Sequence, residues 1–172
     1  MKITVVVASQ GKNMEIARKL SETLKSKNVH SDIIDIVDLD LPLYSTKVDG
    51  LHDAAKIISP IMDKLVADGF VFVAPEYNGS VPPSFANFLA WVSRSTKDWR
   101  DAFNGKPCLI ATHSAGGGLS VLTVMRLQLA FLGMNVIGRQ LHSTLAKGLE
   151  ETAIQLTCDQ LITLAKKLSK EA

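Results

Sequence analysis

The sequence has little of several features that would narrow its class at once. Among 172 residues there are only two cysteines, Cys108 and Cys158, with no CxxC pair and no histidine at ligand spacing. We therefore expect two buried thiols, no disulfide framework and no metal site. No apolar run reaches the roughly 20 residues that span a bilayer. The short apolar run near the N-terminus has no signal-type cleavage context. These absences favour a cytoplasmic protein with no membrane partner.

An excess of charge of one sign is also missing. Lysine and arginine total 19 and aspartate and glutamate 17, which gives a net charge of +2, and the basic residues are scattered. A nucleic-acid-binding protein normally gathers its basic residues on one face. Lys166, Lys167 and Lys170 are grouped, but near a helix C-terminus such a group is typical of a solvated face. We expect no nucleic-acid partner.

Short apolar runs alternate five times with segments of helical period. The length predicts one domain, residues 1–172, able to bury roughly 70% of its unfolded surface. Alternation of this kind predicts an α/β fold, in which a parallel sheet carries helices on both faces. We predict the strand order 2-1-3-4-5. The predicted strands are residues 3–8, 30–37, 70–74, 106–112 and 134–138.

Proline and glycine mark the start, the end or a break in two of the predicted helices. Pro60 either begins its helix, with Ser59 as the N-cap, or kinks it. A later helix begins near Gly118 and stops at Gly133. The leucines and methionine of that helix lie on one stripe: Leu119, Leu122, Met125, Leu129 and Leu132. Residues 38–52 and 139–148 are predicted loops without a recognisable signature.

Three loops of unusual composition follow the first, third and fourth strands, where open sheets bind their ligands. The first is SQGKN, Ser9, Gln10, Gly11, Lys12 and Asn13, at a helix N-terminus that favours an anion. A capped tight turn is an equally good interpretation of this loop alone. It matches neither GxGxxG nor GxxxxGK[ST], so the common dinucleotide and P-loop fingerprints are absent.

The loop after the fourth strand reads THSAGGG. Consecutive glycines bring backbone groups close to a flat or anionic ligand, although three glycines alone are more typical of a flexible turn. His113 beside Ser114 suggests a hydrolase, but Thr112 replaces the first glycine of GxSxG. We therefore expect His113 to be solvated or hydrogen-bonded.

The loop after the third strand reads PEYNGS. Tyr77 has a ring that can stack on a planar cofactor, Gly79 leaves room for its edge, and the backbone amides of residues 76–80 can bond polar ring atoms. A tyrosine alone is more often a surface packing residue. Together the three loops predict a pocket with a phosphate end and a planar end, as flavin mononucleotide (FMN) requires.

The string APEYNGSVPPSFANFLAWVSR closely resembles the PEYNxSxPxxLKNxxDW signature of the NAD(P)H-dependent FMN reductase family. GKPCLIATHSAGGG and VMRLQLAFLGMNVIG are similar to two further family segments, so the resemblance covers most of the chain. It departs at the first loop, where the family arginine is missing and Lys12 offers a charge without the bidentate fork. Ala86 replaces a family lysine.

The resemblance implies a flavodoxin-like three-layer α/β/α sandwich and a homodimer or homotetramer. It implies hydride transfer from NADPH or NADH through FMN to a small-molecule acceptor such as a flavin, quinone, azo compound or metal oxyanion. No catalytic side chain is expected, because the flavin carries the chemistry. The implied FMN contacts are Ser9, Gln10, Gly11, Lys12 and Asn13 at the phosphate, Pro75, Glu76, Tyr77, Asn78, Gly79 and Ser80 along the ring, and Ser114, Ala115, Gly116 and Gly117 at its pyrimidine edge.

Two other functions stay open from the sequence. An electron carrier of the flavodoxin type would bind FMN without nicotinamide turnover, but a chain of net charge +2 lacks the acidic docking surface usual in such carriers. A flavin-free binding relative is the second. A receiver-type signalling module is rejected, because Ala8 and Ser9 stand where acidic residues are required.

Overall fold

The computed structural model describes residues 1–171, and its centre is a parallel sheet. The strand order is β2-β1-β3-β4-β5, as the sequence predicts. A further short strand, β6, also pairs in parallel with β4. The strands are β1 (Lys2–Val7), β2 (His30–Asp35), β3 (Gly69–Val73), β4 (Pro107–His113), β5 (Asn135–Val136) and β6 (Leu141–Ser143).

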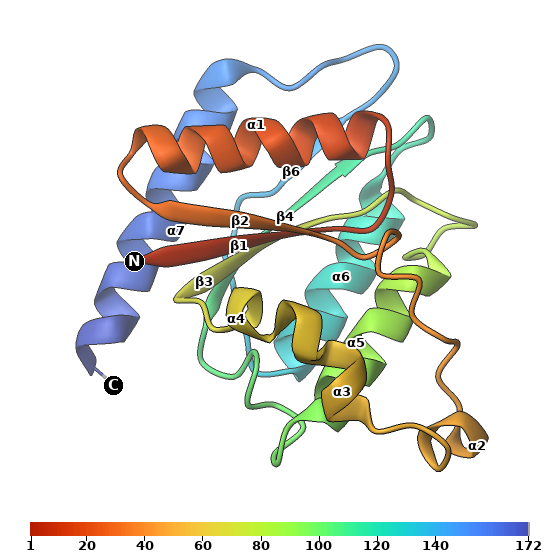
Figure 1. The fold of residues 1–172 in the computed structure, drawn as a ribbon. Coiled ribbons are helices and arrows are strands. Elements are labelled where there is room, and N and C mark those ends of the chain that lie inside the picture. The colour runs from red at the N-terminus through yellow and green to blue at the C-terminus, as the bar shows by residue number, and fades with distance from the viewer. Residues whose placement is uncertain (172) are drawn as a thin grey trace.

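The sheet is covered on both faces by helices, which makes three layers (Figure 1). One core lies under α1 and α7 and the other under α3, α4, α5 and α6. Neighbouring residues of one strand enter different cores: Phe70 and Phe72 pack on the second group of helices and Val71 and Val73 on the first. This alternation follows from the pleat. The helices are α1 (Lys12–Ser26), α2 (Thr46–Asp49), α3 (Ala54–Ile58), η1 (Ser59–Ile61), α4 (Met62–Leu65), α5 (Pro83–Ser95), α6 (Leu119–Phe131) and α7 (Glu151–Glu171).

The edge beyond β4 differs from the prediction of one strand at 134–138 and a loop at 139–148. Two short strands share the edge position, with β5 beside the start of β4 and β6 beside its end. Between them the backbone detours, and Arg126 of α6 donates to the carbonyl oxygen of Ile137 at 3.1 Å and to Oε1 of Gln140 at 3.2 Å. Three residues of strand are too few for a readable period, so β6 was not predicted.

Pro60 interrupts its helical segment, which is one of the two outcomes that the sequence leaves open. The chain passes from α3 through the 3₁₀ turn η1 into α4. Pro60 has no N–H, so a continuous α-helical hydrogen-bond ladder cannot pass through it. The segment begins with a side-chain cap, because Oδ1 of Asp53 accepts from the N–H of Ala55 at 3.0 Å.

The stripe predicted for α6 is confirmed at four of its five positions. Leu122, Met125, Leu129 and Leu132 are buried. Leu119, at 61% exposed, is the member of the stripe that lies outside the core. It is the first residue of α6, immediately after the glycine loop.

Candidate functional site

The three loops of unusual composition lie side by side at the carboxyl ends of β1, β3 and β4. Backbone hydrogen bonds between these strands connect the points where the loops begin. Ala8, after β1, donates its N–H to the carbonyl of Val73 at 2.9 Å. Ala74, after β3, donates to the carbonyl of Ala111 at 3.1 Å and accepts from Oγ1 of Thr112 at 2.7 Å. The loops therefore begin from a rigid base.

The buried amide of Asn13 joins the first loop to the third. Its side chain is 4% exposed. Oδ1 accepts from the N–H of His113 at 2.8 Å and Nδ2 donates to the carbonyl of His113 at 3.1 Å. His113 is in turn held by its ring, since Nδ1 lies 2.7 Å from Oγ of Ser143. The expectation that His113 is hydrogen-bonded is thus confirmed.

The first loop presents backbone donors and little free charge. Gly11 is the N-cap of α1 with φ 65°, and no side chain caps the helix there. Nζ of Lys12 forms an ion pair with Glu15 at 2.9 Å, so part of its charge is already matched. The side chain of Gln10 turns aside to Asp38, at 2.9 Å. What remains for an anion is the row of N–H groups in the first turn and the helix dipole.

The second loop is a tight hairpin turn, and the geometry of the turn explains why Asn78 and Gly79 occupy its two central positions. Both have positive φ, 51° and 73°. Positive φ at both central residues is the signature of a type I′ turn, for which Asn-Gly is the preferred pair. Tyr77 and Ser80 exchange backbone hydrogen bonds at 2.9 and 3.0 Å across the turn. The turn projects the ring of Tyr77, which is 51% exposed.

The three glycines of the third loop have different structural roles. Gly118 has φ 67°, and a Cβ there would lie 2.9 Å from the ring of His142, so only glycine fits. A Cβ on Gly117 would meet nothing within 4 Å, and φ is not positive at Gly116 or Gly117. Packing therefore explains Gly118 alone. Gly117 leaves open space above the loop, as a planar ligand requires, whereas a Cβ on Gly116 would touch Glu76 and Ser114 at 3.9 Å.

Side-chain caps are absent from the helices that begin at these loops and present in two that begin elsewhere. The N-caps of α1, α5 and α6 are Gly11, Pro82 and Gly118, and none has a side-chain cap bond. By contrast, α2 and α3 are capped by Ser45 and Asp53. Uncapped N-terminal N–H groups need another acceptor. At α1 and α6 that acceptor is a ligand or solvent.

Glu76 completes the fit of the site to a ligand that donates hydrogen bonds. Its Oε2 is buried without any partner. Its Oε1 lies 3.9 Å from the place of a Cβ on Gly116. With the uncapped helix and the open glycines, the donors and acceptors of the three loops suit a molecule with an anionic end and a flat polar end. FMN has both.

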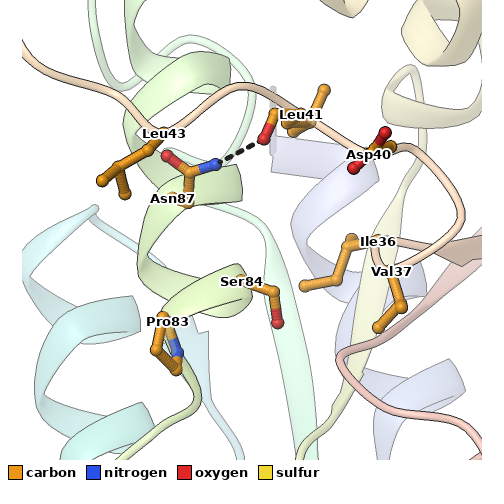
Figure 2. A pocket seen from close by; sticks show the side chains of 8 residues that line it. All are labelled: Ile36, Val37, Asp40, Leu41, Leu43, Pro83, Ser84 and Asn87. Atoms are coloured by element: carbon orange, nitrogen blue, oxygen red, sulfur yellow. Dashed lines mark hydrogen bonds between the residues drawn. The ribbon is translucent and has the colours of Figure 1, made fainter.

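Two cavities flank the three loops. One, of about 250 Å³, separates the loop after β2 from the first turns of α5 (Figure 2). The other, of about 380 Å³, lies between α1 and the β6–α7 connection. The first is lined by Ile36, Val37, Asp40, Leu41, Leu43, Pro83, Ser84 and Asn87, and the second includes Lys12, Lys19, His113, Ser143 and Leu145.

Asn87 fixes the wall of the first cavity and was not singled out from the sequence. Its Oδ1 accepts from the N–H of Tyr44 at 2.7 Å, and its Nδ2 donates to the carbonyl of Pro42 at 3.1 Å. The same Nδ2 donates to the carbonyl of Leu41 at 3.3 Å (Figure 2). Trp91, one turn further along α5, donates Nε1–H to the same Pro42 carbonyl at 2.7 Å. The asparagine in FAN was the available signal.

Neither cysteine belongs to the site. Cys108 and Cys158 are free and buried, as predicted. Burial raises the pKa of each thiol to about 12. Both thiols therefore stay protonated at neutral pH and are not nucleophiles.

The sheet order and its two helical layers define a flavodoxin-like protein, and the three loops lie at the carboxyl ends of its strands, where such sheets bind ligands. The sequence profile of the NADPH-dependent FMN reductases matches residues 1–148, and the chain belongs to that family. It is accordingly an oxidoreductase with FMN as cofactor and a reduced nicotinamide nucleotide as co-substrate.

Several known proteins resemble the chain. A quinone reductase of Pseudomonas putida is 34% identical over 139 residues, covering 77% of this chain and 71% of that protein. A quinone reductase of Escherichia coli is 35% identical over 103 residues, 58% of this chain and only 53% of that protein. The solved structure of FerB, a flavoenzyme NAD(P)H:(acceptor) oxidoreductase from Paracoccus denitrificans, matches with TM-score 0.73 and 19% identity over 98% of this chain and 97% of that one.

No helix within residues 1–171 is both long enough and apolar enough to cross a bilayer.

Proposed function

We propose that this protein reduces small quinone-type acceptors with electrons from NADPH or NADH, through FMN held by the three loops. The observation that carries the proposal is the convergence of those loops at one edge of the sheet. There α1 and α6 begin without side-chain caps and Gly117 leaves space for a flat ring. The quinone class is supported by relatives that carry the name quinone reductase.

In this proposal the first loop holds the phosphate. The backbone N–H groups at the start of α1 donate to its oxygens, Ser9 adds a hydroxyl and Lys12 adds a charge shared with Glu15. Asn13 contributes indirectly, because its side chain is committed to the backbone of His113. Gln10 is held by Asp38 and contributes its backbone.

The second and third loops hold the ring. The type I′ turn uses the N–H groups of Tyr77 and Ser80, which leaves those of Glu76, Asn78 and Gly79 to face the ligand. Tyr77 shields one edge of the ring from water. The remaining contacts are Pro75 on the second loop and Ser114, Ala115, Gly116 and Gly117 on the third.

When bound, FMN would supply the hydride chemistry that links the nicotinamide to the acceptor. The side chains of the three loops need only bind and orient the two substrates, which explains why no acid–base pair or nucleophile is arranged among them. The three loops form a single candidate site, so the two substrates would bind there in turn. The acceptor would bind beside the cavity that is lined by Asn87 and by the loop before α2.

The test is an anaerobic titration of the purified protein loaded with FMN. Adding NADPH or NADH should bleach the flavin absorbance, and adding a benzoquinone should restore it. Steady-state rates against both substrates should give the parallel lines of a ping-pong cycle. Protein that holds FMN but is bleached by neither nucleotide would act as an electron carrier. Protein that does not retain FMN would be a flavin-free binding relative.

We also propose a homodimer formed through the outer face of α5 and α6. Large apolar side chains are exposed there, including Leu127 and Phe131, and Trp99 stacks near Phe131 with ring centroids 5.5 Å apart. A shallow cavity of about 230 Å³ lies between the two helices, and Oε1 of Gln128 on its wall is buried without a partner. Apolar faces of this kind are typical of homodimer interfaces. Sedimentation should give twice the chain mass, and Phe131→Glu should halve it.

A cytoplasmic location is the last part of the proposal. Its support is chemical: both cysteines are free thiols, which fits a reducing compartment. Fractionation of cells that express the tagged protein would test it.

A further inference from the structure

The cavity of about 380 Å³ beside the first loop extends away from the three loops along α1. Its lining residues on this helix stand at positions i, i+3, i+4 and i+7, which places them on one face: Lys12, Glu15, Ile16 and Lys19. The β6–α7 connection lies opposite this face and forms the other wall (Figure 1). Volumes of about 300–1,000 Å³ are usual for sites that bind small molecules. The cavity is therefore large enough for one half of a dinucleotide.

The walls of this cavity carry a positive charge that they do not fully match. The charged residues that line it within residues 1–171 are two lysines and one glutamate. Nζ of Lys12 pairs with Glu15 inside the cavity at 2.9 Å. Nζ of Lys19 pairs at 2.7 Å with Glu151 of α7, which lies outside the lining, and both side chains are about half exposed. Exposed pairs add little stability, so Lys19 can exchange this partner for an anion in the cavity. The cavity of about 250 Å³ is less suited to an anion, because Asp40 lines it.

Apolar and polar side chains complete the cavity in a pattern that suits a nucleoside. Ile16 of α1 and two leucines of the β6–α7 connection, Leu145 and Leu149, supply apolar surface. Leu145 is 81% exposed, so a flat base placed against it would remove apolar surface from water. Ser143 and His113, at the ends of β6 and β4, are held together at 2.7 Å between Oγ and Nδ1 and offer polar groups to a sugar. The chemistry of the lining therefore fits a nucleoside that carries a negative charge.

We propose that this cavity binds the adenosine half of the reduced nicotinamide co-substrate, and that Lys19 recognises the 2′-phosphate that distinguishes NADPH from NADH. The inference rests on the proposed function and adds the residue that selects between the two nucleotides. Lys12 and Lys19 are seven residues apart, roughly 10 Å along the helix axis. The FMN phosphate at the start of α1 and the 2′-phosphate two turns further on therefore use different cations. With NADH the cavity receives a neutral hydroxyl, and Lys19 stays with Glu151.

The experiment compares two variants of one ion pair, Lys19→Ala and Glu151→Gln. Lys27→Ala is the matched control, because Lys27 and Asp159 form a second ion pair between the end of α1 and α7, at 2.7 Å, and neither lines the cavity. Calorimetry on protein loaded with FMN measures the binding of adenosine 2′,5′-bisphosphate and of AMP. FMN fills the phosphate site of the first loop in advance, so a further anion binds elsewhere. Steady-state rates with a benzoquinone give kcat/KM for NADPH and NADH, and circular dichroism confirms that each variant is folded.

The unaltered protein and Lys27→Ala should bind the bisphosphate at least about tenfold more tightly than AMP, the effect of a hydrogen bond between charged groups. They should prefer NADPH to NADH in kcat/KM, and the preference should shrink as salt is added. Lys19→Ala should lose most of this preference through a lower kcat/KM for NADPH, with the value for NADH unchanged. Glu151→Gln should strengthen the preference, because it removes the competitor for Lys19. A purely structural ion pair would give the two variants effects of the same sign.

Equal binding of the bisphosphate and AMP by the unaltered protein would overturn the inference. Effects of the same sign in Lys19→Ala and Glu151→Gln would also overturn it, as would a loss of preference in Lys27→Ala as large as that in Lys19→Ala. If NADPH and NADH reduce bound FMN equally well, the inference fails and the proposed function stands. If neither nucleotide reduces bound FMN, the proposed function fails and the inference fails with it.

Discussion

The side-chain amide of Asn13 closes two hydrogen bonds on the backbone of His113, one hundred residues away, at 2.8 and 3.1 Å. An amide is the only uncharged side-chain group that offers one donor and one acceptor in this geometry. It fastens the start of α1 to the end of β4. The phosphate end and the ring end of the candidate site are thereby held at a fixed separation.

Asn13→Ala should lower the free energy of unfolding by about 2 kcal/mol, because it leaves a buried N–H and a buried carbonyl without partners. Urea denaturation followed by circular dichroism measures the change. Gln10→Ala is the matched control in the same loop, since it removes one exposed hydrogen bond to Asp38 and should stay within about 0.5 kcal/mol. An equal loss of unfolding free energy in the two variants would show that the bonds to His113 stabilise the fold no more than one exposed hydrogen bond does.

Lys12→Glu should weaken FMN binding at least about tenfold, equivalent to about 1.4 kcal/mol. The variant replaces a cation with an anion beside the phosphate and also faces Glu15, the present partner of Lys12. Titration of the flavin fluorescence measures it, and the loss should shrink as salt is added. Lys19→Glu, further along α1, should leave the affinity nearly unchanged. An unaltered affinity in Lys12→Glu would place the phosphate elsewhere.

Asn78→Leu should weaken FMN binding and also destabilise the protein by about 1–2 kcal/mol, because a leucine at φ 51° is strained. From the sequence alone this substitution would be expected to leave the fold untouched, since the loop lies outside the core. Asn78→Gly separates the two effects, because glycine accepts the positive φ and should keep both stability and affinity. A loss of affinity in the glycine variant would assign the contact to the asparagine side chain.

The neighbouring glycines provide a second matched pair. Gly118→Ala should lower the free energy of unfolding by about 2 kcal/mol or more, because φ is 67° and the new Cβ would meet His142 at 2.9 Å. Gly117→Ala should leave stability unchanged and reduce FMN affinity, since its Cβ enters open space above the loop. Thermal unfolding and flavin titration on both variants test this reversal of effects.

Thiol labelling tests the burial of the cysteines as a function of pH. Burial raises the pKa of Cys108 and of Cys158 to about 12 from an ordinary 9.0. At pH 10 an ordinary thiol is mostly thiolate, whereas one with a pKa near 12 is about 1% thiolate. Native protein should therefore resist alkylation through pH 10 and label fully in denaturant. The raised pKa also means that this contribution to stability is complete below pH 9 and declines as the pH rises toward 12. Rapid labelling of the native protein at pH 8 would contradict the buried placement.

Local sequence patterns were enough for the fold because parallel strands covered on both faces are continuous apolar runs. The apolar runs that begin at Ile3 and Phe70 predict their strands without any long-range information. The Asn-Gly pair at positions 78 and 79 is likewise a local signal for a hairpin turn. The three loops could be assigned to one edge because each follows a strand of a parallel sheet.

Long-range contacts could not be predicted in the same way. Nothing near Asn13 in the sequence identifies His113 as its partner, and nothing in GGG separates the packed Gly118 from the open Gly117. The short strand at Leu141 depends on Arg126, which bonds the detour that precedes it. Such residues acquire their roles only when distant segments meet.

The attachment of residues 41–53 to α5 has a consequence for how this protein can change. Asn87 and Trp91 bond the chain near Pro42, and Arg94 pairs with Asp49 at 3.0 Å. All three anchors belong to the helix rather than to the loop they hold. The stretch between Pro42 and Asp49, which includes the exposed Leu43, can therefore accept substitutions and insertions while the three loops of the candidate site keep their positions. New acceptors can thus be acquired by mutation in one short segment, with no penalty in cofactor binding.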